Sequence, residues 1–113
     1  MSRVFIKPLS VNEAWKGKRF KTDKYLAYEK HMLFILPKIS LPSQPFQINY
    51  TFGLSNSLSD FDNPVKPLTD ILQKKYKFND RDIFKAVIVK QKVDKGNEFI
   101  DFEILHYDSD TNI

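Results

Sequence analysis

Residues 46 to 52, which read Phe-Gln-Ile-Asn-Tyr-Thr-Phe, alternate between apolar and polar side chains. A period of two is typical of a β-strand that is buried on one face only. The apolar face of such a strand has to be covered by a second layer of the same domain. The segment therefore predicts a half-buried strand in a sheet with helices packed on it.

The segment from residue 23 to residue 36 predicts the first helix of that layer. It is rich in helix-favouring residues, offers Thr22 or Asp23 as its N-cap, and ends before Pro37. Residues 3 to 7 are typical of a short strand that precedes it.

A second helix is predicted from Asn63 to about Tyr76. Asn63 followed by Pro64 has the pattern of an N-cap with proline in the first helical position. The apolar side chains of this segment fall on one side of a helix, and its polar side chains fall on a neighbouring arc. The polar arc places Asp62, Lys66 and Asp70 in one stripe.

The C-terminal part of the chain predicts two more strands. Residues 83 to 93 are rich in β-branched side chains, residues 94 to 97 have turn chemistry, and residues 98 to 107 contain alternating side chains. We expect a terminal hairpin here. Residues 108 to 113 lack a core pattern and are expected to form a loose tail.

The predicted order is β-α-β-α-β-β, a mixed α+β or α/β fold in which two helices pack on a mixed sheet. A chain of 113 residues with 42% hydrophobic content is expected to form one folded domain, which we place at residues 1–107. The chain contains no cysteine, so a disulfide and a thiolate metal site are excluded. No segment is apolar for long enough to predict a membrane span.

Acidic residues are concentrated in the second half of a basic chain. Residues 1 to 59 contain nine Lys or Arg residues and three acidic residues, whereas residues 60 to 113 contain nine Lys or Arg residues and eleven acidic residues. A basic surface attracts a polyanion such as DNA, and an acidic pocket within it can hold Mg²⁺ against a phosphate. This distribution favours a metal-dependent nuclease.

Five residues are the candidates for that chemistry. Asp60, Asp62 and Asp80 can supply carboxylate ligands to Mg²⁺, which provides a nucleophilic water and neutralises phosphate charge. Lys66 lies one helical turn beyond Asp62 and can reach the phosphate or the leaving oxygen. Asp70 is placed as an outer ligand or as the partner that orients Lys66.

Simpler explanations exist for each of these features. An Asp-x-Asp pair is more often a solvated turn, and a Lys66–Asp70 pair can be an ordinary surface ion pair. The aromatic residues Phe61 and Phe78 are better explained by packing than by stacking on DNA. The chain has no Walker or Gly-x-Gly-x-x-Gly motif, so no nucleotide cofactor is expected.

In order along the chain, the motif residues resemble the signature of one family, the RusA Holliday junction resolvases of bacteria and prophages. The resemblance is carried by Asp60-x-Asp62-Asn63-x-x-Lys66-x-x-x-Asp70-x-Leu72 and by Asn79-Asp80-x-x-Ile83. The opening segment, Pro8-Leu9-Ser10-Val11-Asn12 with Tyr25 and Tyr28 further on, is also similar to that family. The family often has two consecutive acids where this chain has Asn79-Asp80.

The resemblance implies a homodimeric, Mg²⁺-dependent endonuclease that places paired, symmetric nicks in four-way DNA junctions during recombination and repair, with Mn²⁺ as a substitute metal. It implies that Asp60, Asp62 and Asp80 bind the metal and that Lys66 is the essential cation, with Asn63 and Asp70 in secondary roles. It also implies a cytoplasmic protein encoded by a bacterium or phage.

Basic residues around this site are expected to contact DNA phosphates without reading sequence. They are Lys16, Lys18, Arg19, Lys21, Lys24, Lys74, Lys75 and Lys77. A four-way junction has approximate two-fold symmetry, which independently favours a dimer. Three alternatives remain open: a module that binds branched DNA without cutting it, a nuclease of flaps or forks, and a scaffold or phage accessory protein with a chance acidic motif.

Overall fold

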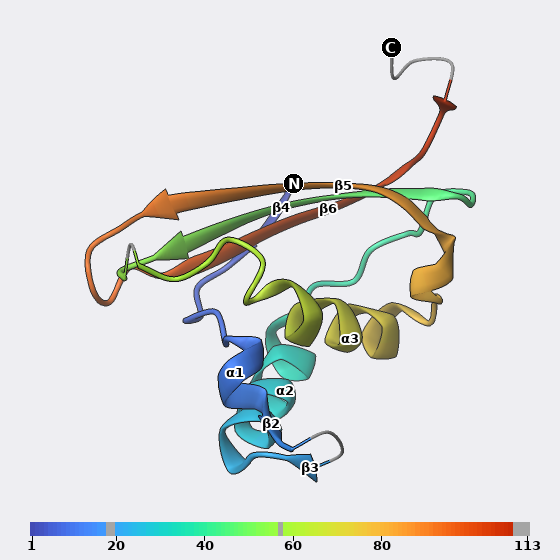
Figure 1. The fold of residues 1–113 in the computed structure, drawn as a ribbon. Helices are drawn as coiled ribbons and strands as arrows, with labels where there is room; N and C mark the ends of the chain where they lie inside the picture. Colours follow the sequence, from blue (N-terminus) through green and yellow to red (C-terminus); the bar gives the residue numbers. More distant parts are fainter. Residues whose placement is uncertain (18–19, 57, 110–113) are drawn as a thin grey trace.

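A four-stranded mixed sheet forms the upper layer of the molecule, and helices cover one of its faces (Figure 1). The computed structural model describes residues 1–17, 20–56 and 58–109. The sheet has the order β1–β6–β4–β5, with the bounds β1 Ser2–Val4, β4 Phe46–Leu54, β5 Ile83–Lys92 and β6 Phe99–His106.

Three α-helices lie on the covered side of the sheet. Their bounds are α1 Val11–Ala14, α2 Asp23–Ile35 and α3 Val65–Tyr76, and a short 3₁₀ helix, η1 Asp80–Asp82, leads into β5. A two-stranded sheet of β2 Trp15–Lys16 and β3 Phe20–Lys21 extends away from the main sheet (Figure 1). None of the helices among the described residues is long and apolar enough to cross a membrane. The fold is mixed α+β, as the sequence predicts.

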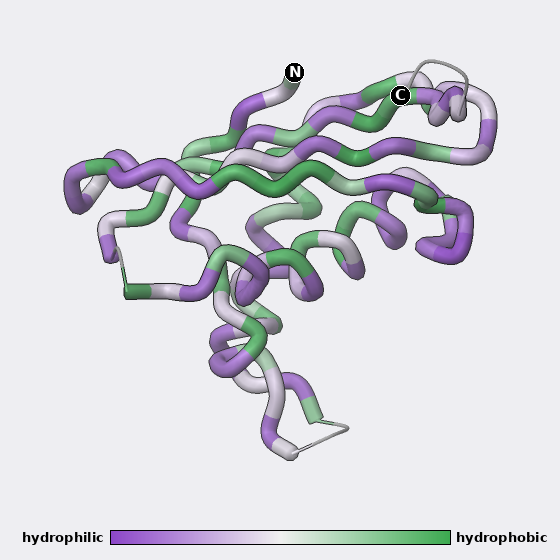
Figure 2. Tube along the Cα trace, turned by 45° about the horizontal axis from the view of Figure 1, so that its top comes forward, coloured by the Kyte–Doolittle hydropathy of each residue, from purple (hydrophilic) through white to green (hydrophobic). Residues whose placement is uncertain are grey.

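β4 is the central strand of the core. It pairs in parallel with β5 and antiparallel with β6, and Phe46, Ile48, Tyr50 and Phe52 are buried beneath it. The alternate positions are only half-buried, so the predicted half-buried strand is confirmed. Hydrophilic and hydrophobic residues are interspersed in the sheet, whereas β5 contains an unbroken hydrophobic stretch at residues 86 to 89 (Figure 2). The apolar side chains of α3 complete the core: Leu68, Ile71 and Leu72 are fully buried.

The predicted terminal hairpin is wrong, although both of its strands exist. β5 and β6 each pair with β4, which lies between them, and neither pairs with the other. The connection from residue 93 to residue 98 therefore crosses two strand spacings, roughly 10 Å. The N–H of Val93 donates to the C=O of Leu54 over 2.9 Å and fixes this crossing at the end of β4. Turn residues alone do not specify which strand lies next to which.

The predicted helix starts are confirmed in one case and wrong in the other. Thr22 is the N-cap of α2, and its hydroxyl accepts a hydrogen bond from the N–H of Tyr25 over 3.2 Å. Asn63 does not cap α3, which begins at Val65 after Pro64 and has no side-chain cap. The reason is a tight turn, since the N–H of Asn63 donates to the C=O of Asp60.

The helix α1 and the two-stranded β2–β3 sheet are elements that the sequence did not predict. The helix has four residues and each strand has two, so none of these segments is long enough to show a periodic pattern. β6 ends at His106, and residues 110–113 of the expected tail lie outside the described part of the chain.

The uncovered face of the sheet contains one close contact between strands. Gly53 lies opposite Phe99 in the register, and the Phe99 ring occupies the space above it. The guanidinium of Arg3 lies 3.8 Å from the centroid of this ring and donates two hydrogen bonds to Asp101, at 2.6 and 2.9 Å. The absence of a side chain at Gly53 is therefore what allows Phe99 to be buried.

We expect Gly53→Ala to lower the free energy of unfolding by about 1–3 kcal/mol, as for overpacking of a filled core. A Cβ at this position would overlap the ring of Phe99, which is buried under Arg3 and has no free direction to move. Urea unfolding of the purified variant measures the change. Thr51→Ala, on the same strand and face, is the control and is expected to cost less than about 1 kcal/mol. Equal losses in the two variants would contradict the close-contact explanation.

Candidate active site

The segment that carries Asp60 and Asp62 is a loop between β4 and α3, here called the site loop, residues 55 to 64. It ends in a tight turn, because the N–H of Asn63 donates to Asp60 O over 3.3 Å and the N–H of Val65 donates to Asp62 O over 3.1 Å. These bonds place Phe61 and Asp62 at the two central positions of a β-turn. Both of these side chains, and that of Asp60, are exposed.

Two lysines of β5 and one residue of α1 hold the site loop in place. The ammonium of Lys90 donates to the C=O of Ser59 over 2.7 Å, and that of Lys92 donates to the C=O of Ser55. On the other side, the N–H of Val11 donates to the C=O of Asn63 over 2.8 Å. The loop is therefore attached at its beginning, its middle and its end.

The sequence did not identify Lys90 and Lys92 as part of the site. They lie on the same face of β5 because they are two residues apart, and β5 runs parallel to β4, so its end lies beside the start of the site loop. The Lys-Gln-Lys sequence of residues 90 to 92 does indicate that two lysines share one face of a strand. That these lysines lie beside the site loop follows only from the parallel pairing of β5 with β4.

A groove follows the exposed side of α3. It is a shallow cavity of about 320 Å³, and its walls include most of the predicted polar stripe. The lining residues are Asp62, Val65, Lys66, Thr69, Asp70 and Asp80. Asp60 does not line this groove, although it lies in the same turn as Asp62.

Lys66 and Asp70 form an ion pair on the wall of the groove. The ammonium of Lys66 donates to both carboxylate oxygens of Asp70 at 2.9 Å, across one turn of α3. Asp70 is the more buried partner, with 26% of its side chain exposed against 61% for Lys66. An exposed pair of this kind contributes only about 0.3–0.5 kcal/mol. A phosphate can therefore replace Asp70 as the partner of Lys66 at little cost.

Gln73 connects this ion pair to the segment that carries Asp80. Its amide nitrogen donates to Asp70 Oδ1 over 3.4 Å, and its amide oxygen accepts a hydrogen bond from the N–H of Asp80 over 2.8 Å. The side chain of Asn79 caps η1 by accepting from the N–H of Arg81. Gln73 is a further residue of the candidate site that the sequence analysis did not identify, because its contacts depend on the position of η1.

The carboxylates of Asp60, Asp62 and Asp80 are exposed and make no ion pair or hydrogen bond with the residues that the structure describes. Asp80 lies close to Gln73, whereas Asp62 precedes the first residue of α3. The rise of the helix separates Val65 from Gln73 by about 12 Å. Both nevertheless line the same groove, Asp62 from the turn before α3 and Asp80 from η1 after it.

The chemistry of these side chains fits Mg²⁺ bound together with a phosphate. Within residues 1–17, 20–56 and 58–109, no three acidic or histidine side chains form a metal-binding group. Mg²⁺ does not require three, because it is usually held by one or two carboxylates and takes its other ligands from water and substrate phosphates. Asp60 and Asp62 provide two hard oxygen donors on one anchored turn.

The predicted DNA-binding lysines are partly engaged within the protein. Glu29 accepts from Lys21 at 3.0 Å and from Lys74 at 3.2 Å, while Glu13 accepts from Lys24 at 2.7 Å. Burial opposes ionisation of Glu29, but the hydrogen bonds from the two lysines outweigh it and hold its pKa below the ordinary value.

The other predicted basic residues differ in exposure and placement. Lys75 donates to the C=O of Leu33 over 3.2 Å, so it stabilises the contact between α2 and α3. Lys16 and Lys77 are exposed. Lys18 and Arg19 lie outside the described residues. Exposed ion pairs are weak, so the paired lysines also remain available to a polyanion.

Tyr25 and Tyr28, which take part in the family resemblance, belong to the core. Both are buried, and Trp15 packs edge-on against Tyr25 with 5.1 Å between the ring centroids. Burial raises the pKa of both hydroxyl groups, so they remain neutral at physiological pH. These tyrosines position α2 rather than contact a ligand.

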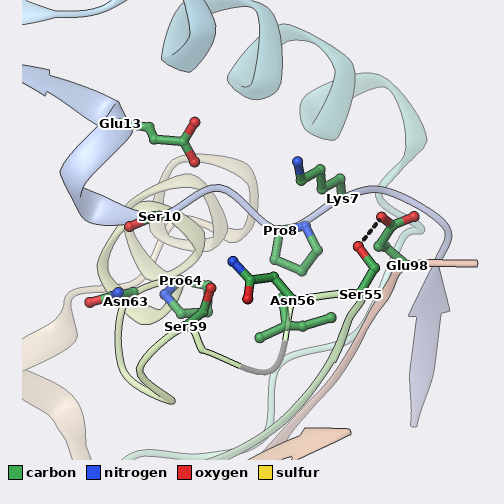
Figure 3. Close-up of a pocket in the computed structure, with 11 residues that line it drawn as sticks. Lys7, Pro8, Ser10, Glu13, Ser55, Asn56, Ser59, Asn63, Pro64 and Glu98 are labelled. Carbon is green, nitrogen blue, oxygen red and sulfur yellow. Dashed lines mark hydrogen bonds between the residues drawn. The ribbon is translucent and has the colours of Figure 1, made fainter. Parts of the chain in front are cut away.

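A second cavity adjoins the site loop and is enclosed by residues of three segments (Figure 3). It has a volume of about 130 Å³, and Lys7, Asn56 and Glu98 are among its polar lining residues. Ser55 donates to Glu98 over 2.8 Å. Hydrogen bonds from its own N–H, from Ser55 and from the N–H of Gly96 hold the pKa of Glu98 below its ordinary value. None of the candidate metal ligands lines this cavity.

Comparison with models of protein families gave no match, and comparison with characterised proteins gave none either. The likeness to the RusA family therefore depends on the spacing of Asp60, Asp62, Lys66 and Asp80 in the sequence. The structure adds where these four side chains lie and what each of them contacts.

We expect Gln73→Ala to increase hydrogen exchange of the Asp80 amide about fivefold, because one hydrogen bond of about 1 kcal/mol is lost. Gln73→Glu keeps an acceptor oxygen and is expected to retain the protection. Lys74→Ala, on the same helix but facing Glu29, is the control. Hydrogen exchange of the Asp80 amide, measured by NMR, tests this prediction. An unchanged rate in Gln73→Ala would mean that the Gln73 side chain does not hold η1.

Proposed function

We propose that this protein is a Mg²⁺-dependent endonuclease of branched DNA that acts as a Holliday junction resolvase of the RusA type. One observation carries the proposal. Asp60 and Asp62 expose two carboxylates, unpaired among the described residues, on an anchored turn, and Asp62 lines a groove that also contains Lys66. Two carboxylates and a cation beside a groove are suited to a metal ion and a phosphate that bind together.

Each side chain has a part in the proposed reaction. Asp60 and Asp62 would hold Mg²⁺, which supplies an activated water and neutralises charge on the phosphate. The ammonium of Lys66 would exchange Asp70 for the phosphate and stabilise the charge that develops in the transition state. Asp70 keeps Lys66 pointed along the groove, and Gln73 holds the segment of Asp80 beside it.

The distribution of charge supports a nucleic-acid substrate. The chain has a formal net charge of +4, and lysines lie on β2, β3 and both ends of α3. Contacts from such lysines would be salt-dependent and would not read sequence. Such an enzyme would act in the cytoplasm of a bacterium or of a phage-infected cell, during recombination and repair.

A homodimer is part of the proposal, because two identical sites are needed to nick two strands of a junction symmetrically. The strand order leaves the outer edge of β5 without a neighbouring strand among the described residues. This edge exposes the apolar side chains Val87 and Val89, at 40% and 47%. An unpaired edge with apolar side chains is suited to a contact with a second copy.

We expect Asp62→Asn to abolish cleavage of a mobile four-way junction in Mg²⁺ or Mn²⁺ and to leave junction affinity within about threefold. The substitution removes a charge from the proposed metal site without changing the basic surface, and the Asp62 carboxylate makes no ion pair or hydrogen bond with the described residues that would be lost. Labelled junctions, with linear duplex, flap and fork as comparison substrates, measure cutting. Asp82→Asn, an acid outside the groove, is the control.

Each other result of this experiment points to a different function. Tight junction binding without any nick in the wild type would indicate a binding module. Preferred cutting of flaps or forks would keep the metal chemistry and replace the substrate. Absence of DNA binding at low salt would leave only the scaffold or accessory protein. A mutant that cuts as well as the wild type would remove Asp62 from the site.

We expect Lys66→Ala to reduce kcat about 100- to 1,000-fold while changing junction affinity less than fivefold, as for a group that acts on transition-state charge. Single-turnover cleavage and binding assays separate the two quantities. Lys30→Ala is the control, since Lys30 is an exposed lysine of α2 that neither lines the groove nor belongs to the predicted DNA contacts. Equal losses of rate and affinity would reduce Lys66 to a phosphate contact.

A further inference from the structure

Phe61 is the exposed aromatic residue of the site loop. Its side chain is 58% exposed, and it lies between Asp60 and Asp62. The sequence favoured packing for both Phe61 and Phe78. The structure agrees only for Phe78, which packs edge-on against Phe46 with 5.6 Å between the ring centroids. Phe61 makes no such ring contact with the described residues.

Leu58 is a second exposed apolar residue of the site loop. It is 89% exposed and lies two residues before Asp60 in the same loop. Single exposed apolar residues are common on protein surfaces and need no explanation. Leu58 and Phe61 differ from that case because both belong to the loop that carries the candidate metal ligands. Here they are called the apolar tip.

The backbone on both sides of Phe61 is held by hydrogen bonds. The N–H of Asn63 donates to the C=O of Asp60 and closes the β-turn that contains Phe61. The ammonium of Lys90 on β5 donates to the C=O of Ser59, the residue before Asp60. A ring on an anchored turn loses little freedom when it contacts a ligand, so more of the contact energy appears as affinity. An exposed aromatic ring with this support is suited to binding a flat partner.

We propose that the apolar tip enters the branch point of the DNA and that the ring of Phe61 stacks on the exposed face of a base pair there. The inference rests on the proposed function, because it takes branched DNA as the substrate. Every nucleobase has a π-face, so an aromatic side chain can stack on any of them regardless of sequence. Apolar side chains also serve as wedges between base steps in proteins that distort DNA.

The proposal explains how a small protein without base-reading contacts can prefer a branch point. In a continuous duplex the bases are stacked on one another, and a ring can enter only by separating them, which costs free energy. At a branch point the stacking is already interrupted, so the ring enters at lower cost. Phe61 would then contribute to the affinity for branched DNA and little to the affinity for linear duplex.

The test measures binding without cutting, in EDTA, to a four-way junction and to a linear duplex of the same length. We expect Phe61→Ala to weaken junction binding about tenfold and to leave duplex binding unchanged. Phe61→Trp is expected to restore junction binding because it keeps an aromatic face. Phe34→Ala is the matched control, since Phe34 is 88% exposed on α2, away from the site loop.

A second readout reports on stacking itself. 2-Aminopurine placed at the branch point is expected to change its fluorescence when the wild type binds and not when Phe61→Ala binds. The same probe inside one arm is expected to remain unchanged with both proteins. Sedimentation of the free proteins detects the competing explanation that Phe61 contacts a second copy of the chain.

The outcomes separate this inference from the proposed function. If the wild type prefers and cuts junctions and Phe61→Ala does both equally well, the stacking role is wrong and the nuclease remains. Equal loss of junction and duplex binding, or conversion of a dimer to a monomer by Phe61→Ala, also overturns it. If the wild type neither prefers nor cuts any branched substrate, the proposed function fails and the stacking role fails with it.

Discussion

The central position of β4 is the constraint on which the rest of the structure depends. Because β4 pairs with β5 on one edge and with β6 on the other, its buried face must be covered by α3, and its end must start the site loop. The parallel pairing with β5 then places Lys90 and Lys92 beside that loop. One strand thus sets the position of the core, the groove and the anchors of the candidate site.

The elements with a strong period could be predicted from the sequence, and the way they are paired could not. The alternation of residues 46 to 52 and the Thr22 cap are local features, so β4 and α2 were identified close to their observed bounds. The position of β4 between β5 and β6 is a non-local choice that turn chemistry at residues 94 to 97 does not encode. The prediction that Asn63 caps α3 was wrong because Asn63 ends a β-turn, in which its N–H donates to the C=O of Asp60.

The same division applies to the candidate site. The stripe of Asp62, Lys66 and Asp70 follows from helical spacing, and the structure places all three along one groove. The roles of Gln73 and Lys90 depend on contacts between elements far apart in the chain, so no local pattern indicates them. The exposure of Phe61 could not be predicted from the sequence either, since an aromatic residue near the start of a helix is expected to pack in the core.

The acids of this chain fall into two groups that differ in what surrounds them. Glu13, Glu29 and Asp101 are each paired with a lysine or arginine of the same chain. Asp60 and Asp62 have no such partner among the described residues, while Lys90 donates a hydrogen bond to the backbone of the same loop at Ser59. Asp60 and Asp62 lie two residues apart on one turn, so both add negative charge to the same part of the site loop. Under the proposed function, a bound Mg²⁺ would neutralise this charge and would take its remaining ligands from water and the substrate phosphate.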